Sequence, residues 1–280
     1  MKAPLPVRDG LGPSRLRLHG GNVLAEFAER FGSGDKVLAG GVVDVHGTVI
    51  DESTELPAGA AVFLYRDLPD EPVVPFDIPV LYRDDNIVVV DKPHFLATMP
   101  RGGHVAQTAL VRLRRDLDLP ELSPAHRLDR LTAGVLMFTS HRAVRGAYQT
   151  LFSRGLVTKI YLARSSADPE LIGAQRICNR IVKERGVLQA RIEPGEPNAE
   201  TLVEPLGGYS YLLTPRTGRT HQLRVHMAAL GVPIDNDPLY PTVLDVAADD
   251  FTRPLHLIAH RLEFDDPVTG THRTFVSSRT

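Results

Sequence analysis

The spacing of apolar residues predicts short strands and helices in mixed order. Between Val23 and Phe31 apolar residues recur at helical spacing, whereas PVLYRDDNIVVVDKP (79–93) sets two apolar runs around a polar RDDN, as in a hairpin. The run GVLMFT predicts a strand, and the next segment predicts a helix that ends at Gly155. Because strands and helices do not alternate regularly, the pattern predicts the α+β class.

Three further elements are predicted towards the end of the chain. TKIYLARS (158–165) alternates with period two, which places Ile160 on one face of a strand and Lys159 and Tyr161 on the other. LVEPLGGYSYLLTP (202–215) predicts a hairpin that turns at Gly-Gly. The stretch 221–231 predicts an amphipathic helix on which Arg224 lies beside the apolar stripe.

A stretch rich in proline and acid, PDEPVVPFDIP (69–79), interrupts the periodic segments. Each proline removes a hydrogen-bond donor and stiffens the chain, so the stretch predicts a linker. We therefore divide the chain into an N-terminal module with its linker at 1–78 and a main domain at 79–280.

Composition is typical of a folded chain with a core of its own, since 42% of the 280 residues are hydrophobic. A single cysteine, Cys178, excludes an internal disulfide and a CxxC metal site. The apolar runs are too short to cross a bilayer, and the first twenty residues contain no apolar signal segment. We expect a cytoplasmic monomer with no membrane partner.

Charge is distributed unevenly although the net charge is only −2. Residues 1–91 hold 8 Lys and Arg against 15 Asp and Glu, whereas residues 101–164 hold 11 against 4. A basic patch, more than the total charge, decides whether a phosphate backbone is attracted. The segment 101–164 therefore favours a nucleic-acid partner, with a solvated charged face as the alternative.

Two motifs carry candidate chemistry. PRTGRTHQLRVHMAALGVPI (215–234) gathers arginines and histidines without any carboxylate on a turn and the start of a helix, a pattern suited to phosphate. Upstream, PAHRLDRLTAGVLMFT (124–139) places Asp129 between Arg127 and Arg130. Neighbouring cations favour the charged form of an acid, so Asp129 is a candidate nucleophile or base.

HRLDRLTAG, TKIYLAR and GRTHQLRVHMAALGVPI, in this order, resemble the RluA-type pseudouridine synthases, enzymes that isomerise uridine in RNA. The resemblance begins near Val80 and includes DKPHFLATMP and LHLIAHRLEFDDPVTG. It implies a pseudouridine synthase fold, with a mixed, largely antiparallel sheet and a central active-site cleft. It also implies an isomerase that needs no cofactor and no metal.

The resemblance assigns roles to individual residues. Asp129 matches the catalytic aspartate, Arg224 the basic residue that pairs with it, and Tyr161 the active-site tyrosine. A uridine stacked in a helix must be flipped out to be reached, and Arg127 resembles the side chain that enters the vacated place. The expected RNA-binding residues are Arg127, His126, Arg130, Lys159, Arg216, Arg219 and His221.

Some positions depart from the family pattern. The usual TSG is Thr132-Ala133-Gly134, the usual GD is Asn236-Asp237, and the histidine often found before the proline of the last motif is Asp266.

The N-terminal module is similar to an S4-type RNA-binding module, although its surroundings are acidic. A small packing domain is the alternative for this module.

We expect the RNA substrate to be structured, with ribosomal RNA favoured over transfer RNA. A transfer-RNA pseudouridine synthase and a non-catalytic RNA-binding or assembly factor are the alternatives. A metal-dependent nuclease would need the histidines as ligands, and His256 with His260 has the spacing of a helical zinc pair. That region is strand-like in pattern and has no HExxH glutamate, so we assign no metal site.

Overall fold

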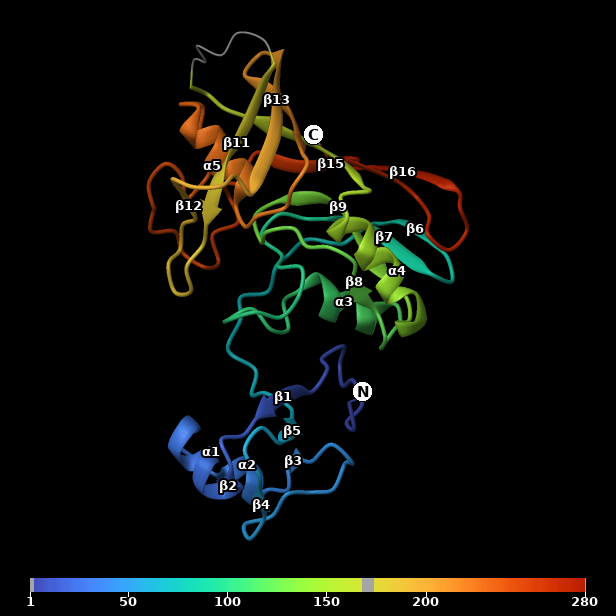
Figure 1. The fold of residues 1–280 in the computed structure, drawn as a ribbon, viewed down its shortest axis with the longest axis vertical. Helices are drawn as coiled ribbons and strands as arrows, with labels where there is room; N and C mark the ends of the chain where they lie inside the picture. The colour runs from blue at the N-terminus through green and yellow to red at the C-terminus, as the bar shows by residue number, and fades with distance from the viewer. Residues whose placement is uncertain (1–2, 168–173, 280) are drawn as a thin grey trace. The chain divides into compact units, whose positions relative to one another are not determined.

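The protein, a computed structural model that describes residues 3–167 and 174–279, contains two compact units (Figure 1). The small unit runs to Asp70 and includes Arg114–Pro120. The large unit holds Glu71–Leu113 and continues from Glu121.

The small unit contains the predicted N-terminal helix, α1 (Val23–Phe31). The side chain of Asn22 accepts a hydrogen bond from the Ala25 amide at 2.9 Å, and Gly32 ends the helix in the left-handed conformation. The S4-type character of this unit stays a prediction. The other elements are β1 (Ser14–Arg17), β2 (Gly21–Asn22), α2 (Asp35–Leu38), β3 (Val42–Val43), β4 (Glu55–Leu56) and β5 (Ala61–Leu64), with β5 between β1 and β3 in one sheet.

The large unit is built on one large sheet, in the order β12-β11-β13-β14-β10-β15-β9-β7-β6, with β16 paired to β15 and β8 to β9. Its elements are β6 (Val80–Arg83), β7 (Ile87–Lys92), α3 (Ala109–Asp116, which runs across the division between the units), β8 (Ser123–Pro124), β9 (Ala133–Thr139), α4 (Arg142–Ser153), β10 (Thr158–Arg164), β11 (Gln175–Val182), β12 (Arg191–Glu193), β13 (Ala199–Gly207), β14 (Ser210–Pro215), α5 (Gln222–Ala229), β15 (Leu257–Asp265) and β16 (His272–Val276).

The pairings among the described strands of this sheet are antiparallel except where β9 runs parallel to β15. There Gly134 faces Ala259 with a φ of +109°, and a Cβ on Gly134 would lie 2.3 Å from the Ala259 carbonyl oxygen. Only glycine allows the two backbones to approach this closely. The mixed, largely antiparallel sheet expected from the sequence is confirmed.

The core of the large unit forms where β7 and β9, both buried along their whole length, pack against α4. The hydroxyl of Tyr148 on α4 donates to the Asp266 carboxylate at 2.9 Å, and the same carboxylate accepts from the amides of Val268 and Thr269. Asp266, a departure from the family pattern, thus closes the β15–β16 turn. The buried cluster consists of Ile87, Val89, Ala125, Val135, Met137, Val144, Tyr148, Leu151, Val157, Leu262 and Phe264.

The hairpins predicted at 79–93 and 202–215 are confirmed as β6–β7 and β13–β14. The predicted strand at 158–165 is β10, and its register with β15 shifts between Ile160 and Tyr161. The shift arises because β15 has one extra residue, His260, at this step.

The proline-rich stretch has no strand or helix, as the sequence predicts, but from Glu71 onward it packs within the large unit. The Glu71 carboxylate accepts from the amides of Ala106 and Gln107, and Arg112 donates to the Val74 carbonyl. The domain limit between 78 and 79 stays a prediction. In the parts of the chain that the structure describes, no helix is both long and apolar enough to span a membrane.

Candidate active site

Asp129 lies in the loop that joins β8 to β9, and 33% of its side chain is exposed. Its carbonyl accepts from the Thr132 amide at 3.1 Å, which closes a turn just before β9. Nη1 of Arg224, on α5, lies 3.9 Å from Oδ2 of Asp129. The structure therefore brings together the acid and the arginine that the sequence motifs single out.

Arg224 is 2% exposed and is held mainly by another acid, Asp237. Nε and Nη2 of Arg224 donate to the two carboxylate oxygens of Asp237 at 2.7 and 2.5 Å. Burial alone would lower the pKa of Arg224, but the hydrogen bonds and charge of Asp237, with the charge of Asp129, raise it. The guanidinium is thus fixed by Asp237 and presents its third nitrogen to Asp129.

Asp237 itself is held by the loop after α5. Its Oδ1 also accepts from the amides of Leu239 and Tyr240 at 2.8 and 3.2 Å. The preceding residue, Asn236, has a φ of +61°. Asparagine tolerates this left-handed conformation better than most residues, which explains how the family's usual glycine is replaced here.

Tyr161 on β10 is half-buried, and its phenol interacts electrostatically with the carboxylate of Asp129. Burial and then Asp129 raise the pKa of Tyr161 above its usual value. The phenol is therefore protonated at neutral pH and offers a hydrogen-bond donor and a ring face beside the Asp129 loop.

Lys92, at the end of β7, is fully buried and lies close enough to Asp129 to interact with its charge. Its Nζ donates to the carbonyls of Pro93, Leu96 and Arg130 at 2.9, 2.8 and 3.3 Å. Burial lowers the pKa of Lys92 to about 7, against the opposing effect of Asp129. Lys92 thus ties the Asp129 loop to the end of β7.

Tyr240 joins α5 to the β11–β12 hairpin. Its hydroxyl lies 2.9 Å from Nδ1 of His221 and also bonds to the backbone of Ala190. The Arg224 guanidinium carbon lies 5.3 Å from the centre of the Tyr240 ring, within the range of a cation–π contact. Burial lowers the pKa of His221, while the charge of Asp129 opposes this shift.

The arginine-rich turn before α5 is fixed by the side chain of Gln222. Its Oε1 accepts from the Thr217 hydroxyl and the Arg219 amide, and its Nε2 donates to the Glu200 carbonyl. Arg216 is 72% exposed and forms a 3.5 Å ion pair with Glu200. Arg219 is exposed, and its Nε donates to the Asn198 carbonyl at 3.0 Å. The turn is therefore ordered while both arginines keep contact with solvent.

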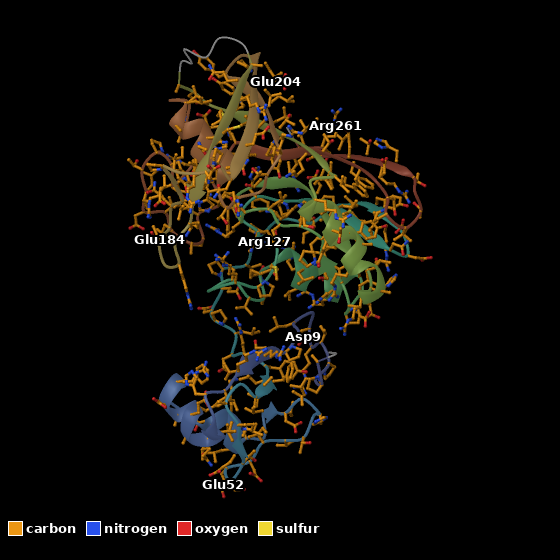
Figure 2. The ribbon with its side chains drawn as sticks, viewed as in Figure 1. Asp9, Glu52, Arg127, Glu184, Glu204 and Arg261 are labelled. Carbon is orange, nitrogen blue, oxygen red and sulfur yellow. The ribbon has the colours of Figure 1, made fainter. Side chains whose placement is uncertain are left out.

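The remaining predicted RNA-binding residues differ in exposure. Arg127, labelled in Figure 2, is exposed, whereas Arg130 is half-buried and its pKa is lowered by burial and by Arg224. Lys159 donates to the Thr217 carbonyl at 3.0 Å, and burial lowers its pKa.

His126 packs inward. Its ring stacks on Phe152, with centroids 4.4 Å apart, and its Nε2 accepts from the Met137 amide. Burial lowers the pKa of His126 to about 3, so the ring is neutral. The structure thus shows a packing contact for His126, and its role in RNA binding stays a prediction.

The histidine pair at 256 and 260 is not helical. His260 lies within strand β15, and His256 directly precedes this strand, so the two are not on adjacent turns of a helix. Among residues 3–167 and 174–279, no group of three or more His, Cys, Asp or Glu side chains is arranged to hold a metal ion.

Two site residues, Lys92 and Asp237, were not predicted. A charged pair, Asp91-Lys92, directly follows the apolar run of β7, which is an available signal for a buried charge. Asp237 lies at the family's usual GD position, Asn236-Asp237, but nothing in the local sequence indicates that it pairs with an arginine on α5.

The chain is similar to a known family of proteins. Residues 86–229 match the sequence profile of the RNA pseudouridylate synthase family. The chain is 36% identical over 180 residues to Pseudouridylate synthase RPUSD2 of Homo sapiens. This match covers 62% of the chain but 33% of the relative, so the chain spans about a third of that protein's length.

A second relative is matched over nearly its whole length. The Dual-specificity RNA pseudouridine synthase RluA of Salmonella typhi is 34% identical over 207 residues, which cover 70% of this chain and 90% of the relative. The solved structure of Human RNA Pseudouridylate Synthase Domain Containing 1 is similar in fold, with a TM-score of 0.59 and 26% identity over 75% of this chain and 86% of that one. The chain therefore belongs to the RNA pseudouridylate synthase family and is of the RluA type.

Proposed function

We propose that this chain is an RNA pseudouridine synthase that isomerises specific uridines in structured RNA. The observation that carries the proposal is the half-exposed Asp129, which has the Arg224 guanidinium 3.9 Å away and the protonated phenol of Tyr161 within reach of its charge. A carboxylate is the group that glycosidic chemistry uses at an anomeric carbon, and here a fixed cation and an aromatic donor accompany it.

The reaction breaks the bond from C1′ of the ribose to N1 of uracil and forms a bond from C1′ to C5. The proton on C5 leaves and N1 gains one, so no atom or electron is supplied from outside. Asp129 either attacks C1′ to form a glycosyl ester or removes the C2′ proton to give a glycal. In both cases the reacting group is the carboxylate that faces Arg224.

Arg224 stabilises this carboxylate in one orientation, because its other two nitrogens are bound to Asp237. Tyr161 stacks on the freed uracil and donates its phenolic hydrogen to it. Since its pKa is raised, Tyr161 is a poor acceptor for the C5 proton near neutral pH, and its role is that of a donor.

A base-paired uridine reaches Asp129 only when it leaves the stack, and Arg127 fills the vacated place. Its exposure and its position two residues before Asp129 support this role. Arg216 and Arg219, on the turn before α5, bind phosphate. Arg130, Lys159 and His221 contribute to the same RNA-binding surface. Ribosomal RNA is the favoured substrate. Transfer RNA is the second candidate.

The test is pseudouridine mapping of total RNA from cells that express the wild-type chain or the Asp129→Asn variant. This nearly isosteric change removes the charge, and we expect one or a few sites to vanish. Asp85→Asn, an exposed acid between β6 and β7, is the matched control and should leave the map unchanged. A map that is identical in the Asp129→Asn cells contradicts the catalytic assignment.

The same map identifies the substrate, because the vanished sites lie either in ribosomal or in transfer RNA. If the chain binds RNA but no site depends on Asp129, it is a binding or assembly factor. The proposed cytoplasmic location and monomeric state are tested separately, by fractionation and by light scattering of the purified protein.

A further inference from the structure

The backbone on both sides of Asp129 is held by side chains from the end of β7 and from the segment that follows it. Lys92, the last residue of β7, bonds to the Arg130 carbonyl, and two side chains of the following segment, His94 and Thr98, bond to neighbouring residues of the loop. Neither His94 nor Thr98 belongs to the acid–arginine–tyrosine group described above.

Thr98 fixes the residue directly before Asp129. Its hydroxyl donates to the Leu128 carbonyl at 2.8 Å and accepts from the Leu128 amide at 3.1 Å. The Thr98 side chain is buried, so water does not compete for these bonds. One hydroxyl therefore satisfies both backbone polar groups of Leu128.

His94 fixes the second residue after Asp129. Its Nδ1 lies 2.8 Å from the Leu131 carbonyl oxygen, which can only accept, so Nδ1 carries the hydrogen. Burial lowers the pKa of His94 to about 4, although the bond to Leu131 opposes this shift, and the ring is neutral at physiological pH. His94 thus acts as a fixed donor.

The segment that carries these two side chains is itself rigidly packed. Phe95, between His94 and Thr98, has a φ of +65°, a conformation that bulky residues rarely adopt. The Phe95 ring is buried, and its centroid lies 6.2 Å from that of Phe76 and 5.4 Å from that of Phe251. Tertiary packing therefore imposes the conformation that aims His94 and Thr98 at the loop.

We propose that His94 and Thr98 are positioning residues for the reaction, which hold the backbone around Asp129 so that its carboxylate meets the ribose in a reactive geometry. This inference rests on the proposed function. A displacement of the reacting group by about 1 Å lowers a rate by about 100-fold, so a hydrogen bond that fixes the loop acts on turnover. Neither side chain has to touch the RNA.

The first experiment replaces Thr98 by valine, which keeps the shape and removes the hydroxyl. Purified protein in excess is mixed with total RNA from cells that lack the chain, and pseudouridine formation is followed at the mapped sites. We expect Thr98→Val to lower the single-turnover rate by about 10- to 100-fold with RNA affinity unchanged, and Thr98→Ser to restore most of it.

Thr139→Val is the matched control. Thr139 is also buried, and its hydroxyl donates to the Ser123 carbonyl at 3.2 Å at the far end of β9. This variant loses a hydroxyl–carbonyl bond of the same kind away from Asp129, so it should melt at a similar temperature to Thr98→Val but keep the wild-type rate. An equal loss of rate in both valine variants shows a general structural effect and overturns the positioning role.

A second pair of variants tests His94. His94→Leu removes the donor, whereas the amide of His94→Asn can place an N–H near the position of Nδ1. We expect His94→Leu to be slow and His94→Asn to recover part of the rate. If both variants match the wild type, His94 has no positioning role.

The outcomes separate this inference from the proposed function. A wild-type chain that forms no pseudouridine in any RNA overturns the proposed function and the positioning role with it. An active wild type whose Thr98→Val variant is equally fast overturns the positioning role alone. Hydrogen exchange detects a loosened loop independently of activity. In Thr98→Val the Leu128 amide should exchange faster than in the wild type, whereas the exchange rates of amides near Thr139 should not change.

Discussion

Arg224 and Asp237 form a two-point ion pair in the interior, with Nε–Oδ2 and Nη2–Oδ1 distances of 2.7 and 2.5 Å. Asp129 lies at 3.9 Å from the remaining guanidinium nitrogen. The arginine therefore interacts with two acids to different extents. Asp237 binds Nε and Nη2, and only Nη1 faces Asp129. This arrangement keeps the reactive carboxylate beside a cation without a tight bidentate bond.

Asp237→Asn should destabilise the protein and slow the reaction. The change leaves the Arg224 charge buried without its main partner, which costs about 3 kcal/mol in the free energy of unfolding. The guanidinium is then free to bind Asp129 tightly, which reduces the reactivity of that acid. Urea unfolding and the single-turnover rate measure the two effects.

The control for Asp237→Asn is Glu184→Gln, which breaks an exposed ion pair with Arg191 (Glu184 is labelled in Figure 2). An exposed pair contributes little, so this variant should unfold like the wild type. If Asp237→Asn is as stable as Glu184→Gln, the buried pair does not stabilise the folded protein.

Tyr161→Phe keeps the ring and removes the hydroxyl. RNA affinity should therefore stay close to that of the wild type, whereas the single-turnover rate should fall by about 100-fold or more if the hydroxyl donates in the reaction. Tyr209→Phe, in the exposed β13–β14 turn, is the control and should be fully active. Wild-type turnover in Tyr161→Phe would reduce Tyr161 to a packing role.

Gly134→Ala should strongly destabilise the large unit. The new Cβ would lie 2.3 Å from the Ala259 carbonyl oxygen and 2.7 Å from the Ala259 amide nitrogen, and both are backbone atoms that cannot move alone. We expect a loss of about 3 kcal/mol or more in the free energy of unfolding.

Gly146→Ala provides the opposite case. Gly146 lies inside α4, and a Cβ there meets nothing within 4 Å. Alanine in a helix interior should stabilise by about 0.5–1 kcal/mol. Thermal melts of both variants test the pair, and a stable Gly134→Ala protein would contradict the close β9–β15 contact.

His226 should make the protein less stable in acid. It is fully buried between Thr201 and Asn179, and burial lowers its pKa to about 4 from a usual 6.5. Between these values the unfolded chain binds a proton that the folded chain does not bind. Stability is therefore complete above about pH 6.5 and falls as the pH is lowered towards 4, by about 3 kcal/mol for this group.

The measurement for His226 is urea unfolding of the wild type and His226→Gln at several pH values from 7 to 4. The variant should show a shallower decline over this window. His272→Gln, an exposed histidine paired with Asp265, is the control and should keep the wild-type slope. Parallel curves for the wild type and His226→Gln would show that the buried ring does not contribute the pH dependence.

Local sequence pattern determined the elements and the chemistry they carry. Period two identified β10, and helical spacing identified α1. Two apolar runs around a polar turn identified the β6–β7 hairpin, and the motifs placed Asp129 before β9 and Arg224 on α5. The strand and helix predictions succeeded because burial of an element leaves a pattern of apolar residues along the chain. The structure then placed Asp129 and Arg224 together, as the motifs indicated.

Tertiary structure alone decided which distant groups meet. The pairing of Arg224 with Asp237, the bonds of Lys92, His94 and Thr98 to the Asp129 loop, and the inward packing of His126 leave no periodic trace in the sequence. Such contacts depend on where loops lie once the sheet has formed, because a side-chain hydrogen bond is set by a distance in space. Periodicity reports which face of an element is buried, and it carries no information about that distance.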